Sequence, residues 1–189
     1  RAEVPPGVDL RLGVEGAQYG WGGAFADAAI RSDSTMNPLY AMVSAGPNDV
    51  FLSGTEASQF TTSSAGAQQV NIAKTSFSED NLYARDYISQ SGNAVINNNA
   101  YDAALSGRDG LTVEFPEKSP IAGQLKSVAR TIKIRDALNT RRQVFYVFMG
   151  DYDTHSGQTG QLPSQHSKLS AAISAFRTEM INQGVWNDV

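Results

Sequence analysis

Unbroken apolar runs and helically spaced apolar residues alternate along the chain, and together they predict an α/β fold. The longest run, Val144 to Met149, stops at Gly150. A continuous run of this length is typical of a strand buried on both faces, as in a parallel sheet, because a half-exposed strand alternates apolar with polar residues. Tyr40 to Ala45 predicts a second buried strand, Val50 to Leu52 a short third one, and residues 10–14 an edge strand.

The first half of the chain also predicts three helices. The first helix covers residues 22–31, where four apolar residues recur at helical spacing: Trp21, Phe25, Ala28 and Ala29. A second helix begins at a Ser78 cap and ends near Gly92, and a third covers residues 94–105. Small and polar residues dominate the stretch 53–69, so we expect a long loop or a loose hairpin there.

The clearest helix signal lies just before the long apolar run. Ser119 and Pro120 supply a cap and a proline at the first helical position, and an apolar stripe continues to Leu138. A last helix is expected from a Ser164 cap to Gly184, with the following residues on its inner face: Leu169, Ile173, Phe176 and Met180. The final five residues then lead toward another strand.

Composition excludes several classes of protein. The 189 residues are 41% hydrophobic, which suits one domain with a sizeable core. The net charge is −4, and the basic residues are scattered apart from Arg141 and Arg142, so we expect no nucleic-acid partner. No apolar run approaches the ~18 residues of a membrane span. The absence of cysteine excludes disulfides and thiolate ligands, and it leaves the cellular compartment open.

Residues capable of metal chemistry follow the long apolar run. Asp153 and His155 flank Thr154, and His166 comes next, in what we expect to be the first turn of the last helix. Ligands gather beyond the carboxyl ends of strands in open α/β sheets, and a carboxylate with imidazoles suits Zn²⁺ or a similar ion. The spacing is equally compatible with a turn in which Asp153 and Thr154 bond their own backbone and His155 and His166 are surface residues. Asp151 could support the ligands or simply form the turn.

Longer blocks of sequence carry a resemblance to a known family. The blocks YGWGGAFADA, YAMVSAGPNDVFLSG, QLKSVARTIKIRDALNTRRQVFYVFMGDYDTHSGQ, HSKLSAAISAF and GVWNDV resemble a large bacterial family of uncharacterised proteins, related to the alkaline phosphatase and sulfatase superfamily. The strand in that family typically ends in Gly-Gly-aromatic-Asp-Thr-His, which residues 150–155 match. Asp151 stands where the family has its second glycine.

The resemblance implies a three-layer α/β/α sandwich of the alkaline-phosphatase type, with a mainly parallel sheet and metal ions at the carboxyl ends of its strands. It implies that residues 1–189 form a single partial domain that lacks an N-terminal strand and a C-terminal part of the metal site. It also implies export by a twin-arginine signal, and hence a periplasmic or secreted protein. Asp153 and His155, with His166, are the positions that carry over as metal ligands, with Asp151 and Thr154 beside them.

From this resemblance we expect a fragment of an exported, metal-dependent hydrolase of phosphate or sulfate esters that uses Zn²⁺ or Mn²⁺. The fragment by itself is expected to be inactive, because its residues offer only Thr154 or a metal-activated water as a nucleophile. The alternative is a non-catalytic binding or surface-assembly module on the same fold. The substrate, the metal and the oligomeric state stay open.

Overall fold

A computed structural model describes residues 19–47, 50–63, 65–67, 82–108 and 110–189. At its centre is a four-stranded sheet, β3-β2-β1-β4, formed by the following strands: β1 (Met42–Ser44), β2 (Gln59–Ser63), β3 (Gly66–Ala67) and β4 (Val144–Tyr146). β1 pairs in parallel with both β2 and β4, and β3 is antiparallel to β2. The α/β expectation is therefore confirmed, with a mostly parallel sheet.

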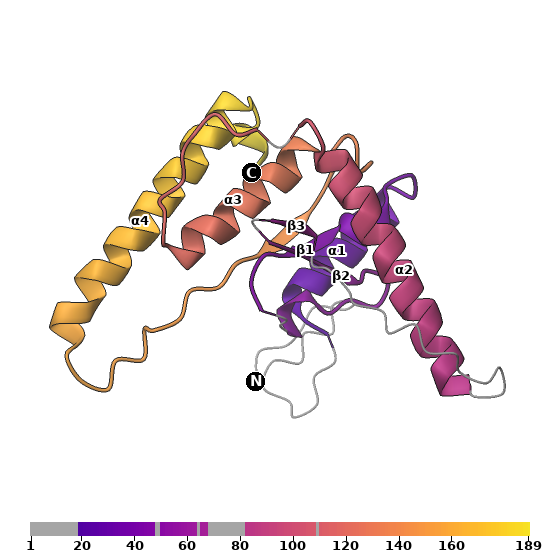
Figure 1. Cartoon of the computed structure of the whole chain (residues 1–189), viewed down its shortest axis with the longest axis horizontal. Coiled ribbons are helices and arrows are strands. Elements are labelled where there is room, and N and C mark those ends of the chain that lie inside the picture. Colours follow the sequence, from indigo (N-terminus) through magenta and orange to yellow (C-terminus); the bar gives the residue numbers. More distant parts are fainter. Residues whose placement is uncertain (1–18, 48–49, 64, 68–81, 109) are drawn as a thin grey trace.

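Within the described part of the chain, four α-helices surround this sheet (Figure 1). They are α1 (Trp21–Ser32), α2 (Leu82–Leu105), α3 (Pro120–Lys133) and α4 (Gln158–Asn182). Three short 3-10 segments accompany them: η1 (Pro38–Tyr40), η2 (Val50–Leu52) and η3 (Trp186–Asp188). α3 and α4 form a pair beside the sheet, and α2 lies on the opposite side of the molecule from α4 (Figure 1).

The central strand β1 explains how the helices are held. Met42 belongs to one core cluster, with Ala26 and Ala29 of α1. Its neighbour Val43 belongs to another cluster, with Tyr101 of α2. Successive side chains of a strand point to opposite faces, so helices cover both faces of the sheet and β1 is fully buried between them.

The long apolar run forms less strand than its composition predicts. Only Val144–Tyr146 pairs in the sheet, and its side chains are half-buried, so the expectation of a fully buried strand reaching Met149 is wrong. Val147 and Met149 instead pack against the α3 and α4 pair, whereas Phe148 is 48% exposed. The run is apolar because it contacts different elements in succession.

One other strand prediction is wrong, and the stretch for which we expected a loop or a hairpin holds a hairpin. Residues Val50–Leu52 form the 3-10 turn η2 and no strand, and the last residues, from which the chain was expected to lead toward another strand, form η3. The expected loop or hairpin over 53–69 holds β2 and β3, a hairpin that joins the sheet through β2. The expected strand over residues 10–14 lies outside the described residues.

The observed helices agree with the predicted ones better than the strands do, but some of their ends and buried faces differ. α2 is continuous through Gly92, so the two predicted helices are one, and the expected Ser78 cap lies outside the described residues. α3 ends at Lys133, before Leu138. α4 starts at Gln158 and contains Ser164, which therefore caps nothing, and Ile173 is 50% exposed.

α1 has the predicted position but a different buried face. Trp21 and Phe25 are 44% and 65% exposed, and the buried face carries Gly22, Gly23 and Ala26 instead. A Cβ at Gly23 would stand 1.9 Å from the carbonyl oxygen of Ser53. The glycines therefore let the segment after η2 lie directly on the helix.

Candidate functional site

The three parallel strands end at one edge of the sheet, and the chain leaves β4 from that edge. The exit segment, residues 147–149, is fixed by the side chain of Gln124 in α3. Gln124 Nε2 donates to Phe148 O at 2.9 Å, and Phe148 N donates to Gln124 Oε1 at 2.6 Å. The side-chain amide thus pairs with the backbone of Phe148 as a neighbouring strand would.

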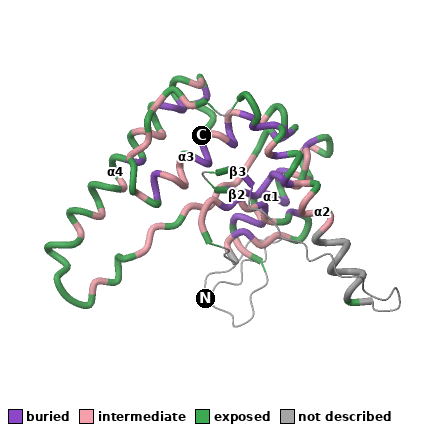
Figure 2. Tube along the Cα trace, viewed as in Figure 1, coloured by how far each residue is buried: buried purple, intermediate pink, exposed green. Residues whose placement is uncertain are grey.

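Beyond this point the chain forms a long, exposed connection to α4 (Figures 1 and 2). The structure brings Asp153 and His155 together on it, with Asp153 Oδ2 at 3.1 Å from His155 Nε2. Both side chains are 88% exposed. Thr154 is half-buried, and its amide donates to the carbonyl of Tyr152 at 3.0 Å. The connection therefore presents a carboxylate and an imidazole to solvent.

Asp151 bends the chain just before this pair. Its φ is +65°, in the left-handed region that glycine adopts without steric cost and that aspartate tolerates better than most residues. Asp151 is exposed, so a charged side chain stands where the backbone has a shape that glycine favours.

His166 lies near the connection but on a different element. It is exposed on α4, nine residues into the helix, so its predicted place in the first turn is wrong. Its ring lies 6.0 Å from the ring of Tyr152, with an interplanar angle of 32°. Tyr152 directly precedes Asp153, so α4 and the connection approach each other at the expected ligands.

A metal needs more ligands than this pair. Structural and catalytic zinc sites use at least three protein ligands. Among the residues that the structure describes, no group of three or more His, Asp or Glu side chains is placed to hold an ion.

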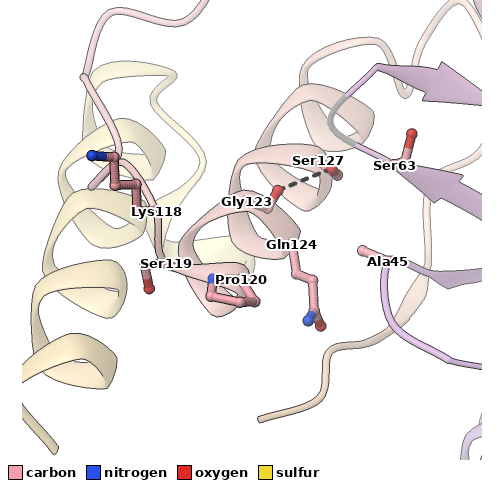
Figure 3. Close-up of a pocket in the computed structure, with 8 residues that line it drawn as sticks. All are labelled: Ala45, Ser63, Lys118, Ser119, Pro120, Gly123, Gln124 and Ser127. Atoms are coloured by element: carbon pink, nitrogen blue, oxygen red, sulfur yellow. Dashed lines mark hydrogen bonds between the residues drawn. The ribbon is translucent and has the colours of Figure 1, made fainter. Parts of the chain in front are cut away.

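A crevice lies at the same edge of the sheet, between the ends of β1 and β2 and the first turns of α3 (Figure 3). Its volume is about 540 Å³, and it is lined by Ala45, Ser63, Lys118, Ser119, Pro120, Gly123, Gln124 and Ser127. Ser119 occupies the cap position of α3 as expected, but its hydroxyl makes no capping hydrogen bond. In the sequence, Ser119 and Pro120 indicate only the start of a helix, so the crevice was not predicted.

In contrast to the exposed Asp153, the carboxylates of Asp27 and Glu179 are buried. Asp27 is 4% exposed and accepts hydrogen bonds of 2.7–3.0 Å from Thr55 N and Oγ1, Glu56 N and Ala57 N. Burial alone would raise the pKa of Asp27, but these donors outweigh it and lower the pKa below its ordinary value. Asp27 therefore has a structural role: it holds the loop after η2 in place.

Glu179 fixes a second loop in the same way. It is fully buried in α4 and accepts from Thr112 N and Oγ1, Val113 N and Gln183 Nε2 at 2.8–3.0 Å. Its burial raises the pKa, and the bonds from Gln183, Thr112 and Val113 lower it by more. Neither carboxylate was singled out from the sequence, because an acidic residue inside a helix gives no sign that it will be buried.

The arginine pair lies at the other end of the sheet. Arg141 and Arg142 precede β4 and are exposed; Arg141 lies 3.8 Å from Asp33, and Arg142 donates to the hydroxyl of Ser32.

Comparison with known proteins adds no assignment. No family model matches the chain, and neither a curated protein nor a solved structure does. No helix in the described part is long and apolar enough to cross a bilayer.

Proposed function

We propose that Asp153 and His155 are two ligands of a divalent metal ion in a hydrolase of phosphate or sulfate esters with an alkaline-phosphatase-like fold. The observation that carries this proposal is the 3.1 Å separation of Asp153 Oδ2 and His155 Nε2 on the connection that leaves a parallel strand. His166 on α4 is the candidate third ligand carried over from the resemblance. Its ring lies 6.0 Å from that of Tyr152, and in the described residues it does not yet complete a group of three ligands with the pair.

The donor atoms fit a metal of the expected kind. Two ligands of one tetrahedral Zn²⁺, each ~2.1 Å from the ion, lie roughly 3.4 Å apart, close to the separation of this pair. Imidazole suits Zn²⁺, and carboxylate also suits Mn²⁺. The bound ion would polarise an oxygen of the phosphate or sulfate ester. The exposed position of the pair gives a small ester direct access to it, and the hydroxyl of Thr154 lies between the two ligands in sequence.

A second function is favoured by a different observation. Trp21 and Phe25 lie one turn apart on α1 and are both well exposed. Exposed aromatic side chains in a row are typical of a surface that binds another molecule. On this alternative the chain is a non-catalytic binding or surface-assembly module, and the Asp153–His155 contact is a surface feature of its own turn. Metal dependence separates the two functions.

Calorimetric titration of Zn²⁺ and of Mn²⁺ into the protein tests the proposal. We expect saturable binding that is lost in Asp153→Ala and in His155→Ala, and weakened in His166→Ala. Asp136→Ala is the matched control, because it removes an exposed carboxylate outside the connection, and it should bind as the wild type does.

Phosphate and sulfate ester hydrolysis is then measured on the product of the complete reading frame that encodes these residues. Activity that requires the added metal and is lost in Asp153→Ala supports the hydrolase. Absence of metal binding, or binding that is indifferent to both the Asp153 and the His155 change, overturns the proposal and favours the binding module.

A further inference from the structure

The two edges of the central sheet differ in how they are protected. β3 forms one edge with only two residues, and the amide of Ala67 there donates to Asp102 of α2 at 3.0 Å. β4 forms the other edge, and among the described residues β1 is its only partner strand. Natural edge strands usually carry a charge, a proline or a bulge that prevents pairing with another chain. The run from Val144 to Met149 has neither a charge nor a proline, so β4 is the unprotected edge.

The backbone of β4 alternates between bonded and free groups. Val144 N donates to Ala41 O at 2.8 Å, and Tyr146 O accepts from the residue after β1 at 3.0 Å, so both groups face β1. Successive residues of a strand turn their backbone groups to opposite sides, which directs the amides of Phe145 and Val147 away from β1. Among the described residues, neither amide has a hydrogen-bond partner. The outer side of β4 therefore presents free donors to another strand.

The side chains of β4 also leave apolar surface for a neighbour. Val144 and Tyr146 pack against the α1 cluster and Phe145 packs on the opposite face, yet all three are half-buried. The residues of β1 beside them are fully buried. Helices cover both faces of the sheet, so the remaining exposure of β4 lies on its outer side. A further strand on that side would bury it, which favours association.

The charges that flank this strand suit an antiparallel copy of the strand itself. Arg141 and Arg142 precede the apolar run, Asp151 follows it, and all three are exposed. In an antiparallel pair, the basic end of one strand lies beside the acidic end of the other, whereas a parallel pair places like charges together. Two identical edges that pair antiparallel are related by a twofold axis, the commonest symmetry of soluble homo-oligomers.

We propose that the free edge of β4 binds the β4 strand of a second copy of this chain in antiparallel orientation. The amides of Phe145 and Val147 then donate to carbonyls of the other copy, and the two sheets become one continuous sheet across the twofold axis. The dimer requires no metal, so it stands or falls separately from the function proposed above.

Amide hydrogen exchange over a series of protein concentrations tests the pairing. We expect the amides of Phe145 and Val147 to become protected as the concentration rises, in step with a dimer detected by sedimentation. The amide of Val144 is the internal control: its bond to Ala41 lies within one copy, so it should be protected at every concentration.

Charge reversal tests the antiparallel orientation without changing the core. Arg142→Glu and Asp151→Lys each place like charges together twice in the symmetric dimer, and we expect each to weaken dimerisation about fivefold. The double variant exchanges the two signs and should regain most of the affinity. Lys168→Glu is the matched control, because it makes the same change in net charge at an exposed position on α4, and it should dimerise as the wild type does.

Val147→Pro tests the edge itself, because proline removes one of the outward donors. The change occurs in both copies, so two hydrogen bonds are lost and dimerisation should weaken about tenfold. Circular dichroism checks that this variant is folded, and the charge variants decide the question if it is not.

Three results would overturn the proposal. A chain that stays monomeric at every concentration has no such interface. Protection of Phe145 and Val147 that does not depend on concentration means that another segment of the same chain covers the edge. A dimer that is indifferent to Arg142→Glu, Asp151→Lys and Val147→Pro uses a different surface.

Discussion

Asp27 and Asp153 place the same carboxylate in opposite surroundings. Asp27 is buried in α1, and four donors of one loop occupy its two oxygens. Asp153 is 88% exposed and has His155 as its described partner. A carboxylate has about four lone-pair positions, so Asp27 has none left for a ligand, whereas Asp153 keeps most of its own. Burial has made one carboxylate structural and left the other available.

The largest effect on stability is expected from the removal of Asp27. In Asp27→Ala the amides of Thr55, Glu56 and Ala57 lose their acceptor, and we expect the free energy of unfolding to fall by about 3 kcal/mol. Urea denaturation measures this change. A loss below about 1 kcal/mol would mean that water replaces the carboxylate at little cost, and that Asp27 does not hold the loop.

Acid should reduce the contributions that Asp27 and Glu179 make to the stability of the fold. The pKa values of Asp27 and Glu179 are lowered by folding, so the unfolded chain binds protons more readily. Their contribution to stability is present above the ordinary pKa values of 3.8 and 4.5, and it is lost as the pH falls through the lowered values of the folded protein. Urea midpoints measured from pH 7 down to pH 3 should fall, and the fall should be shallower in Asp27→Ala. A parallel fall in both proteins would contradict this origin.

The smallest effect on stability is expected at the exposed pair. Asp153→Ala removes a contact with His155 in which both side chains are open to solvent, and even a fully charged pair on the surface contributes only about 0–1 kcal/mol. We expect an unfolding free energy within about 0.5 kcal/mol of the wild type. A loss as large as that of Asp27→Ala would show that Asp153 has a structural role and would remove the contrast between the two sites.

Local signals predicted the elements whose ends are marked in the sequence. α1 and β1 follow their apolar signals, although α1 buries a different face, and α3 starts at Pro120 as its proline signal predicts. Gly184 ends α4 with a φ of +73°. The β2–β3 hairpin was only one of two expectations for residues 53–69, because the sequence of β2, QFTTS, is polar and does not separate a strand from a loop. Its buried Thr62 is satisfied by hydrogen bonds to Tyr101 and to Gly66 O, which only the folded chain supplies.

The candidate site was also predictable only as far as local sequence signals reach. The two-residue spacing of Asp153 and His155 is enough to bring them together, so the sequence revealed the pair. Their exposure and the nearness of Tyr152 to His166 depend on the path of the connection to α4. Gln124 lies 24 residues from Phe148 in sequence, and a side-chain amide that bonds to a distant backbone leaves no pattern to read.

The central claim, that Asp153 and His155 share a metal, is tested most directly by the ring nitrogen NMR spectrum of the protein with and without one equivalent of Zn²⁺. The chain has only two histidines, so His155→Ala assigns the spectrum at once. The claim predicts that Nε2 of His155 takes the shift of a metal-bound nitrogen and that Asp153→Ala abolishes this change. A His155 spectrum that ignores Zn²⁺, or that responds equally without Asp153, would contradict it.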